Sequence, residues 1–143
     1  MLVTRSRIVP APLEAVWAVA ADPYHLPRWW PRVERVEGVG PAGWTSVLRS
    51  ERGKAVRADY RLEASEPHRR RAWAQELDGT PFERLLHESR TEVRLAEASG
   101  GTEVTLQVRQ RPRGWARLGG FLLRRAMRRQ LEEALSGLAE AVG

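Results

Sequence analysis

Three polar side chains between residues 85 and 95 are spaced for chemistry at an interior surface. Strand residues alternate between two faces, so if Val93 faces the interior, His87, Ser89 and Thr91 share that face. A few well-placed polar groups in an apolar pocket orient a small molecule. His87 is also a weak candidate for a general acid or base, because histidine changes its charge near neutral pH. This register predicts His87 and Ser89 as ligand contacts.

The opposite arrangement of this segment is also compatible with the sequence. A β-bulge near Ser89 would add one residue to the strand and reverse the faces of the residues on one side of it. His87 would then be exposed to solvent, and the strand would be an ordinary one. The sequence leaves both registers open, so no catalytic residue is assigned.

Aromatic residues are further candidates for ligand contact. Trp29 and Trp30 are adjacent, so one ring can face inward while the other lies near the rim of a pocket. Tyr60 lies on the inward face of an alternating strand, where its hydroxyl needs a partner when it is buried. The strand around residue 73 has two registers, and the one that we favour places Trp73 inside. Trp30, Tyr60 and Trp73 are therefore predicted ligand contacts, with plain packing as the alternative for each ring.

Several kinds of reactive site are excluded by what the sequence lacks. Cysteine is absent, which excludes disulfides, cysteine-based zinc sites and thiol nucleophiles. The histidines His25, His68 and His87 are far apart, and none belongs to a His-Glu-x-x-His pattern. No glycine-rich phosphate loop and no nucleophile elbow is found. We therefore expect no metal and no cofactor, and an enzyme of this sequence would work without a metal or a covalent nucleophile.

The elements that would position these residues follow from the hydrophobic period. Residues 2–9 predict a strand, and Leu13 to Ala21 predicts a helix, followed by a short second helix that begins near Pro23. The period then changes to two, which predicts about six strands, near residues 33–39, 44–50, 56–62, 70–77, 85–95 and 103–109. The last segment, from about Trp115 to Val142, predicts a long helix whose apolar stripe is Met127, Leu131, Leu135, Leu138 and Val142.

These elements predict an α+β fold in one domain. The links between strands are short, which favours a curved antiparallel sheet of about seven strands over a parallel one. A long helix with one apolar stripe must pack on the apolar face of that sheet. The length of 143 residues fits a single domain over residues 1–143. Because a twisted sheet parts from the helix near its middle, a ligand cavity is expected there.

Two stretches near the N-terminus carry a family resemblance. Residues 8–17 contain Pro-x-x-x-Val-Trp, and residues 21–31 contain Asp-Pro-x-x-x-Pro-x-Trp-x-Pro, while residues 100–106 begin with Gly-Gly-Thr. They resemble the opening strand, the two short helices and the last turn of the START/SRPBCC superfamily, and within it the polyketide cyclase/dehydrase-like proteins. This resemblance implies a helix-grip fold, in which the sheet wraps around the C-terminal helix. It also implies that Leu123 and Met127 lie at the floor of a pocket.

The resemblance implies function only in general terms. It is consistent with binding, transport or sequestration of a small hydrophobic molecule such as a lipid, a quinone or a polyketide-like compound, in a cavity between the sheet and the C-terminal helix. The alternative is a polyketide cyclase, aromatase or dehydratase, in which His87 or Tyr60 assists by proton transfer in the same cavity. A third hypothesis is a basic surface module that docks on a membrane or an acidic partner.

Positive charge gathers before and within the predicted long helix. The net charge is +6, and the segment from residue 111 to residue 129 contains no acidic residue. Apolar residues interleaved with arginines are typical of contact with an anionic membrane or an acidic partner, although a solvated helix face is the alternative. We do not expect nucleic acid as a partner, because arginine is scattered along the whole chain among glutamates. The arginines of this segment are Arg111, Arg113, Arg117, Arg124, Arg125, Arg128 and Arg129.

The N-terminal residues predict where the protein works. Charged residues interrupt the start of the chain before an apolar signal region forms. No stretch approaches the roughly 18 apolar residues of a membrane-spanning helix. We therefore expect a cytoplasmic protein.

Overall fold

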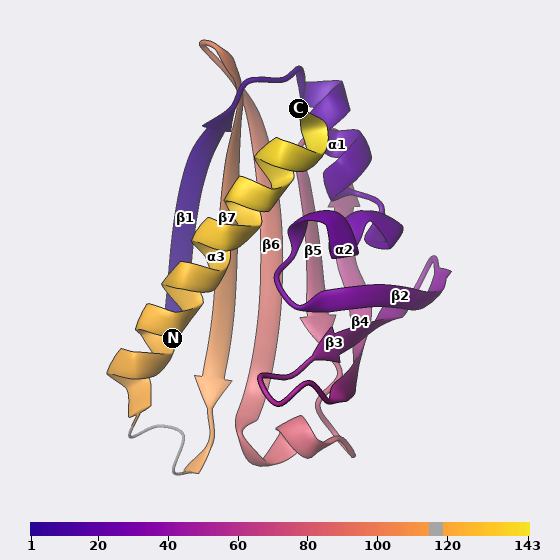
Figure 1. Cartoon of the computed structure of the whole chain (residues 1–143), viewed down its shortest axis with the longest axis vertical. Helices are drawn as coiled ribbons and strands as arrows, with labels where there is room; N and C mark the ends of the chain where they lie inside the picture. The colour runs from indigo at the N-terminus through magenta and orange to yellow at the C-terminus, as the bar shows by residue number, and fades with distance from the viewer. Residues whose placement is uncertain (115–118) are drawn as a thin grey trace.

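A computed structural model describes residues 1–114 and 119–143 of the chain (Figure 1). Seven strands form one sheet, and a long helix at the C-terminal end lies across it. Short helices follow the first strand, and a further helical turn precedes the sixth. The elements in chain order are β1 (Leu2–Val9), α1 (Leu13–Ala20), the 3-10 helix η1 (Pro23–His25), α2 (Leu26–Trp29), β2 (Val33–Gly40), β3 (Gly43–Arg49), β4 (Ala55–Glu66), β5 (Arg70–Gln75), the 3-10 helix η2 (Pro81–Arg84), β6 (Leu86–Ala98), β7 (Gly101–Pro112) and α3 (Gly120–Val142).

The strands of the sheet all pair antiparallel, in the order β1-β7-β6-β5-β4-β3-β2. This confirms the predicted α+β fold with an antiparallel sheet. Strands β2 to β7 form a meander, but β1 pairs with β7, so the first and last strands are neighbours. Gly101 permits this approach, because its φ is +150° and a Cβ there would lie 2.0 Å from the carbonyl oxygen of Val9.

Helix α3 covers one face of the sheet, here called the inner face. Its side chains Met127, Leu131, Leu135 and Leu138 are buried, and Val142 packs against the core while partly buried, which confirms the predicted stripe. The helix runs across β1 and β7 and reaches α1 and α2 near its C-terminal end (Figure 1). It begins at Gly120, and the predicted helical residues 115–118 lie outside the described residues.

The opposite, outer face of the sheet carries paired arginine and glutamate side chains. Glu92 is only 4% exposed and accepts hydrogen bonds from Arg70 at 3.0 Å, Arg90 at 3.1 Å and Arg94 at 2.8 Å. Burial alone raises the pKa of Glu92, but these three guanidinium groups outweigh burial and hold the pKa below its ordinary value. The cluster joins β5 to β6 on a face that α3 does not cover.

Candidate ligand-binding site

Aromatic rings fill the middle of the space between the inner face and the helices. Trp44 stacks on Tyr60 with ring centres 5.6 Å apart, and Trp73 meets Trp44 edge-on at 5.6 Å. Trp30, the residue after α2, has its ring centre 6.2 Å from that of Trp73 and 5.4 Å from that of its neighbour Trp29. These five residues, the aromatic cluster, come from α2, β3, β4 and β5. Edge-on and stacked rings at such distances attract one another beyond their area of burial.

The aromatic cluster leaves almost no empty volume at the centre. A cavity of about 20 Å³ lies between Trp30, Trp44, Ser46 and Tyr60, which is room for about one water molecule. The gap expected near the middle of the sheet is therefore occupied by the protein's own side chains.

A larger hollow opens at the end of the molecule where α3 begins. It has a volume of about 570 Å³ and lies between the first turns of α3 and the adjoining ends of β6 and β7. We call it the mouth groove. Most of its wall is apolar, and two glutamines are its polar side chains. Its described lining residues are Leu85, Leu86, Gln110, Gly119, Leu122, Leu123, Ala126, Met127 and Gln130.

A row of polar side chains crosses the inner face next to this groove. Tyr60 on β4 pairs directly with Gln75 on β5, and Ser89 on β6 pairs with Gln110 on β7. Gln75 stands one position beyond the Ala74–Arg90 pair, which places it opposite Ser89. The four residues of this polar row, Tyr60, Gln75, Ser89 and Gln110, therefore lie side by side across four strands.

The hydrogen bonds of the polar row are incomplete. Gln110 Nε2 donates to Ser89 Oγ over 3.4 Å, which is a long hydrogen bond. Gln75 Nε2 is buried and has no hydrogen-bond partner among the described residues. A buried donor without a partner destabilises a protein unless something accepts its hydrogen bond. The polar row therefore contains one buried donor, Gln75 Nε2, whose hydrogen bond is not used within the described residues.

The hydroxyl of Tyr60 offers a second donor. Burial raises the pKa of Tyr60 to about 12, since the ionised phenolate is poorly solvated there. The phenol is therefore neutral at physiological pH and can donate a hydrogen bond. Tyr60 also lines a second hollow of about 220 Å³, together with Trp30, Leu48 and Phe82. Gln130 on α3 borders both this second hollow and the mouth groove, so the two are neighbours.

The pairing of β6 with β7 changes register at a bulge near His87. Ser89 and Thr91 are 9% and 7% exposed and face inward with Val93, as the first register predicted. The pairing with β7 shifts between Leu86 and Glu88, and His87 lies at this shift with an exposed side chain. The inward orientation predicted for His87 is therefore not found. The alternative, a bulge that leaves His87 exposed, is the arrangement observed, with the irregularity at His87 itself rather than near Ser89.

The other predicted contacts lie at two places. Leu123 and Met127 are in the wall of the mouth groove. Trp73 is buried in the aromatic cluster, which confirms its favoured register, and Trp30 and Tyr60 lie between the cluster and the second hollow.

The sequence reasoning missed the three glutamines and the apolar residues after η2. Gln110 continues the inward alternation of Val104, Leu106 and Val108, so the two-residue period could have identified it. Gln75 shares a strand face with Trp73 and was detectable in the same way. Leu86 and Gln130 carried no such signal, because their role depends on how the start of β6 and α3 face each other across the groove.

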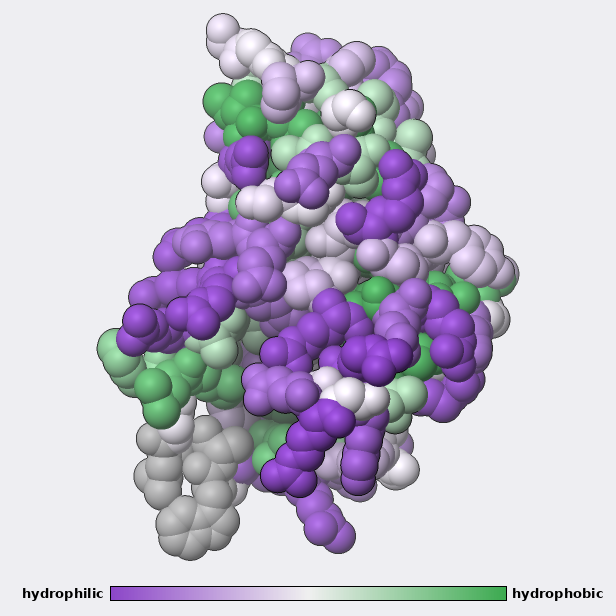
Figure 2. All heavy atoms as spheres, in the orientation of Figure 1, coloured by the Kyte–Doolittle hydropathy of each residue, from purple (hydrophilic) through white to green (hydrophobic). Residues whose placement is uncertain are grey.

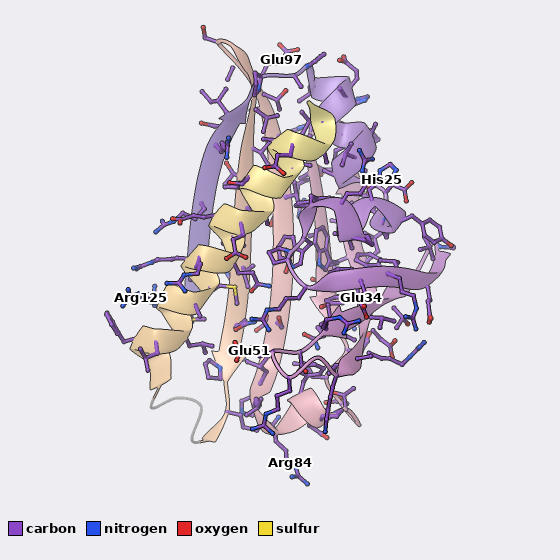
Figure 3. All side chains as sticks on the ribbon, in the orientation of Figure 1. His25, Glu34, Glu51, Arg84, Glu97 and Arg125 are labelled. Atoms are coloured by element: carbon purple, nitrogen blue, oxygen red, sulfur yellow. The ribbon has the colours of Figure 1, made fainter. Side chains whose placement is uncertain are left out.

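The predicted basic residues surround the start of α3. Arg111, Arg124, Arg125, Arg128 and Arg129 are exposed, whereas Arg113 is half-buried. Arg117 lies outside the described residues. Figure 3 shows Arg125 at the left of α3, directed away from the sheet, and Arg84 at the lower end of the molecule.

Metal-binding clusters and membrane-spanning helices are two further features that bear on function. In residues 1–114 and 119–143, no three His, Cys, Asp or Glu side chains gather in a way that could hold a metal ion. None of the helices in those same ranges is long and apolar enough to cross a membrane.

The whole chain is similar to one known protein family. Residues 1–143 match the family described as "Polyketide cyclase / dehydrase and lipid transport". No curated protein matches the chain in sequence.

Solved structures share the fold over its full length. A conserved protein from Geobacillus kaustophilus has a TM-score of 0.81 at 14% identity, with 99% of this chain and 95% of that chain covered. TTHA0849 from Thermus thermophilus has a TM-score of 0.78 at 23% identity, with 99% and 97% covered. The di-domain ARO/CYC BexL from the BE-7585A biosynthetic pathway has a TM-score of 0.76 at 16% identity, with 98% of this chain and 49% of that chain covered. At such identities the likeness establishes a shared fold.

Proposed function

The chain belongs to the polyketide cyclase/dehydrase and lipid transport family, and we propose that it binds a small, mostly apolar molecule in the mouth groove. The observation that carries this proposal is an apolar hollow of about 570 Å³ whose wall includes Gln110 of the polar row and Gln130 of α3. Ligand pockets are typically about 300–1,000 Å³, mainly apolar, with a few placed polar groups.

The polar row indicates which end of the ligand lies deepest. Gln75 Nε2 is a buried donor without a partner among the described residues, and the neutral Tyr60 hydroxyl is a second donor. Both suit a carbonyl, hydroxyl or quinone oxygen on the ligand. The apolar remainder would then lie along Leu123 and Met127, where it removes apolar surface from water. A lipid, a quinone or a polyketide-like compound meets this description.

To test the proposal, a substitution fills the groove, and binding of the neutral apolar dye Nile red is measured. Leu123→Trp places a large ring in the wall of the mouth groove. Ile8→Trp adds the same ring at an exposed position on β1, outside the groove. We expect Leu123→Trp to weaken Nile red binding at least about ten-fold, while Ile8→Trp binds as the wild type does. Native mass spectrometry of the purified protein would then identify a co-purified molecule.

Two results would contradict the proposal. One is a wild-type protein that binds no neutral apolar dye and carries no co-purified molecule. The other is an equal loss of binding in Leu123→Trp and Ile8→Trp, since the dye would then bind outside the groove.

A cyclase or dehydratase activity in the same groove is the second candidate. The feature that favours it is the Tyr60 hydroxyl in the second hollow, which adjoins the mouth groove at Gln130, because a neutral phenol there can donate to the oxygen of a reacting carbonyl. A poly-β-keto thioester, supplied with and without the protein, is the substrate for its test. Aromatic product with the wild type but not with Tyr60→Phe, at unchanged Nile red affinity, would support catalysis. Equal product formation with and without the wild-type protein would contradict catalysis and leave binding as the only proposed function.

A further inference from the structure

Large apolar side chains are exposed around the opening of the mouth groove. Phe121 is 76% exposed and Leu122 is 68% exposed, both in the first turn of α3, and Leu85 across the groove is 54% exposed. Figure 2 shows this apolar end of α3 at the lower left, with hydrophilic side chains directly above it. Contiguous exposed apolar side chains at a rim of charge mark an interaction surface.

The positive charge of the protein is unevenly balanced over its surface. Many arginines of β1 to β6 form ion pairs with glutamate, namely Arg5, Arg32, Arg35, Arg49, Arg57, Arg61, Arg70, Arg90 and Arg94. Among the described residues, none of the ion pairs includes Arg124, Arg125, Arg128 or Arg129. Arg124 instead donates to the backbone oxygen of Leu2 at 3.3 Å. Four exposed arginines without an ion pair among the described residues therefore follow one another on α3, one to two turns from Phe121.

We propose that this end of the molecule docks on an anionic lipid membrane. The docking end consists of Leu85, Phe121, Leu122, Arg125 and Arg128. Phe121 and Leu122 enter the boundary between headgroups and acyl chains, and the two arginines bind lipid phosphates around them. Leu85 and Leu122 of this docking end also line the mouth groove, so a ligand would pass between bilayer and groove without crossing water.

The mixture of groups favours a membrane over a nucleic acid. A polyanion such as RNA would bind the arginines, but the exposed side chains Phe121 and Leu122 would add little to its affinity. A bilayer surface gains from both, because apolar burial and phosphate contact act together on one amphipathic turn. Charge complementarity and continuity with the groove therefore point to the same occupant.

The test measures co-sedimentation with vesicles of phosphatidylcholine, with and without one third phosphatidylglycerol. We expect the wild type to bind the anionic vesicles and not the neutral ones, with binding that falls as salt rises. Arg125→Gln/Arg128→Gln should weaken binding about thirty-fold, since each arginine near the surface contributes roughly five-fold. Phe121→Ser, which keeps every charge, should weaken it by about ten-fold.

The matched control removes the same charge elsewhere. Arg57→Gln/Arg61→Gln lowers the net charge equally but lies on β4, where both arginines pair with glutamates. It should bind vesicles within about three-fold of the wild type, because long-range charge is screened. Equal loss in the two double variants would overturn the proposal, as would equal binding to neutral and anionic vesicles.

Further outcomes separate this proposal from others. If Phe121→Ser binds vesicles as the wild type does while RNA competes for the protein, the surface binds a polyanion and the membrane proposal is wrong. Nile red binding without vesicles tests the groove independently in the same variants, since Phe121, Arg125 and Arg128 are not among its described lining residues. Loss of vesicle binding with normal dye binding therefore reports on docking alone.

Discussion

At the scale of single residues, Tyr60 connects the packed interior to the groove system. Its ring stacks on Trp44, and the residue borders both the central cavity and the second hollow. The ring contributes to the core, and the hydroxyl is left for a partner. One residue therefore serves packing and the proposed recognition together.

The buried hydroxyl predicts a loss of stability in alkali. The folded pKa of Tyr60 is raised from 10.0 to about 12, so the full stability is present below pH 10 and is lost as the pH rises toward 12. At about pH 11.5 the wild type should have lost about 2 kcal/mol of unfolding free energy from this group. Tyr60→Phe should lack this decline, and the exposed Tyr24→Phe should keep it. Urea unfolding at pH 8 and pH 11.5 measures both, and equal declines in the two variants would refute the assignment.

The unpaired amide of Gln75 should lower the stability of the fold, although it is proposed to serve ligand binding. Its buried Nε2 has no partner among the described residues, so Gln75→Met should raise the unfolding free energy by about 1 kcal/mol. Gln107→Met on the outward face of β7 is the control and should change little. The urea concentrations at the unfolding midpoints of the wild type and the two variants measure these differences. A stability loss in Gln75→Met would mean that the amide is satisfied, for example by a bound water.

At the scale of elements, the Glu92 cluster joins β5 to β6 by charge where no helix covers the sheet. Three arginines surround one carboxylate that is almost fully buried. Removing one partner from a buried ionic cluster is more damaging than removing an exposed pair, because like charges are left close together.

Glu92→Gln should therefore lower the unfolding free energy by about 3 kcal/mol at pH 7. The pKa of Glu92 is held below its ordinary value in the fold, so its stabilisation is present above about pH 4.5 and is lost as the pH falls through the folded pKa. The difference in unfolding free energy between the wild type and Glu92→Gln should therefore become smaller in acid. Glu37→Gln, which breaks exposed pairs with Arg35 and Arg57, should cost less than about 1 kcal/mol. Equal effects of the two substitutions in chemical denaturation would contradict the role of burial.

The contact between α2 and α3 depends on a glycine in the middle of a helix. A Cβ at Gly137 would lie 2.6 Å from the backbone oxygen of Trp29 and 2.9 Å from its Cα. Alanine normally stabilises a helix by about 1 kcal/mol over glycine, but here it would push two backbones apart. Gly137 therefore sets the distance at which α3 packs.

Gly137→Ala should lower the unfolding free energy by about 2 kcal/mol. Gly120→Ala, at the start of the same helix with no atom within 4 Å of its Cβ, should leave it unchanged or raise it by up to about 1 kcal/mol. Thermal unfolding of the two variants compares them directly. Stabilisation by Gly137→Ala would show that the helices can separate without loss.

At the scale of the whole molecule, most described arginines of the sheet pair with glutamate, whereas Arg124, Arg125, Arg128 and Arg129 of α3 form no ion pair with the described residues. Two proteins with the same net charge should therefore behave differently on a negatively charged surface. Arg125→Gln/Arg128→Gln should elute from a cation-exchange column at clearly lower salt than Arg57→Gln/Arg61→Gln. Identical elution would mean that net charge, rather than its placement, governs the protein's contacts.

Much of the architecture was predictable because its signals are local. The stripe of Met127, Leu131, Leu135 and Leu138 follows the helical period, and Trp73 follows the two-residue period of its strand. The partner of β1 was not predictable, because strand pairing over a hundred residues has no short-range pattern. His87 was misplaced for a related reason, since a bulge changes the faces of a strand without a residue type that announces it.

By itself, the sequence determined which residues alternate, which helix carries an apolar stripe, and where arginine accumulates without acid, because these properties depend only on residue order. The tertiary structure decided how those residues share space. It showed that five aromatic rings occupy the centre, so that the hollow lies at the end near α3. It also showed that most sheet arginines face glutamates, while those beside Phe121 do not. The volume of a cavity and the balance of charge on a surface depend on residues that are distant in the chain. They are therefore determined only when the fold brings those residues together.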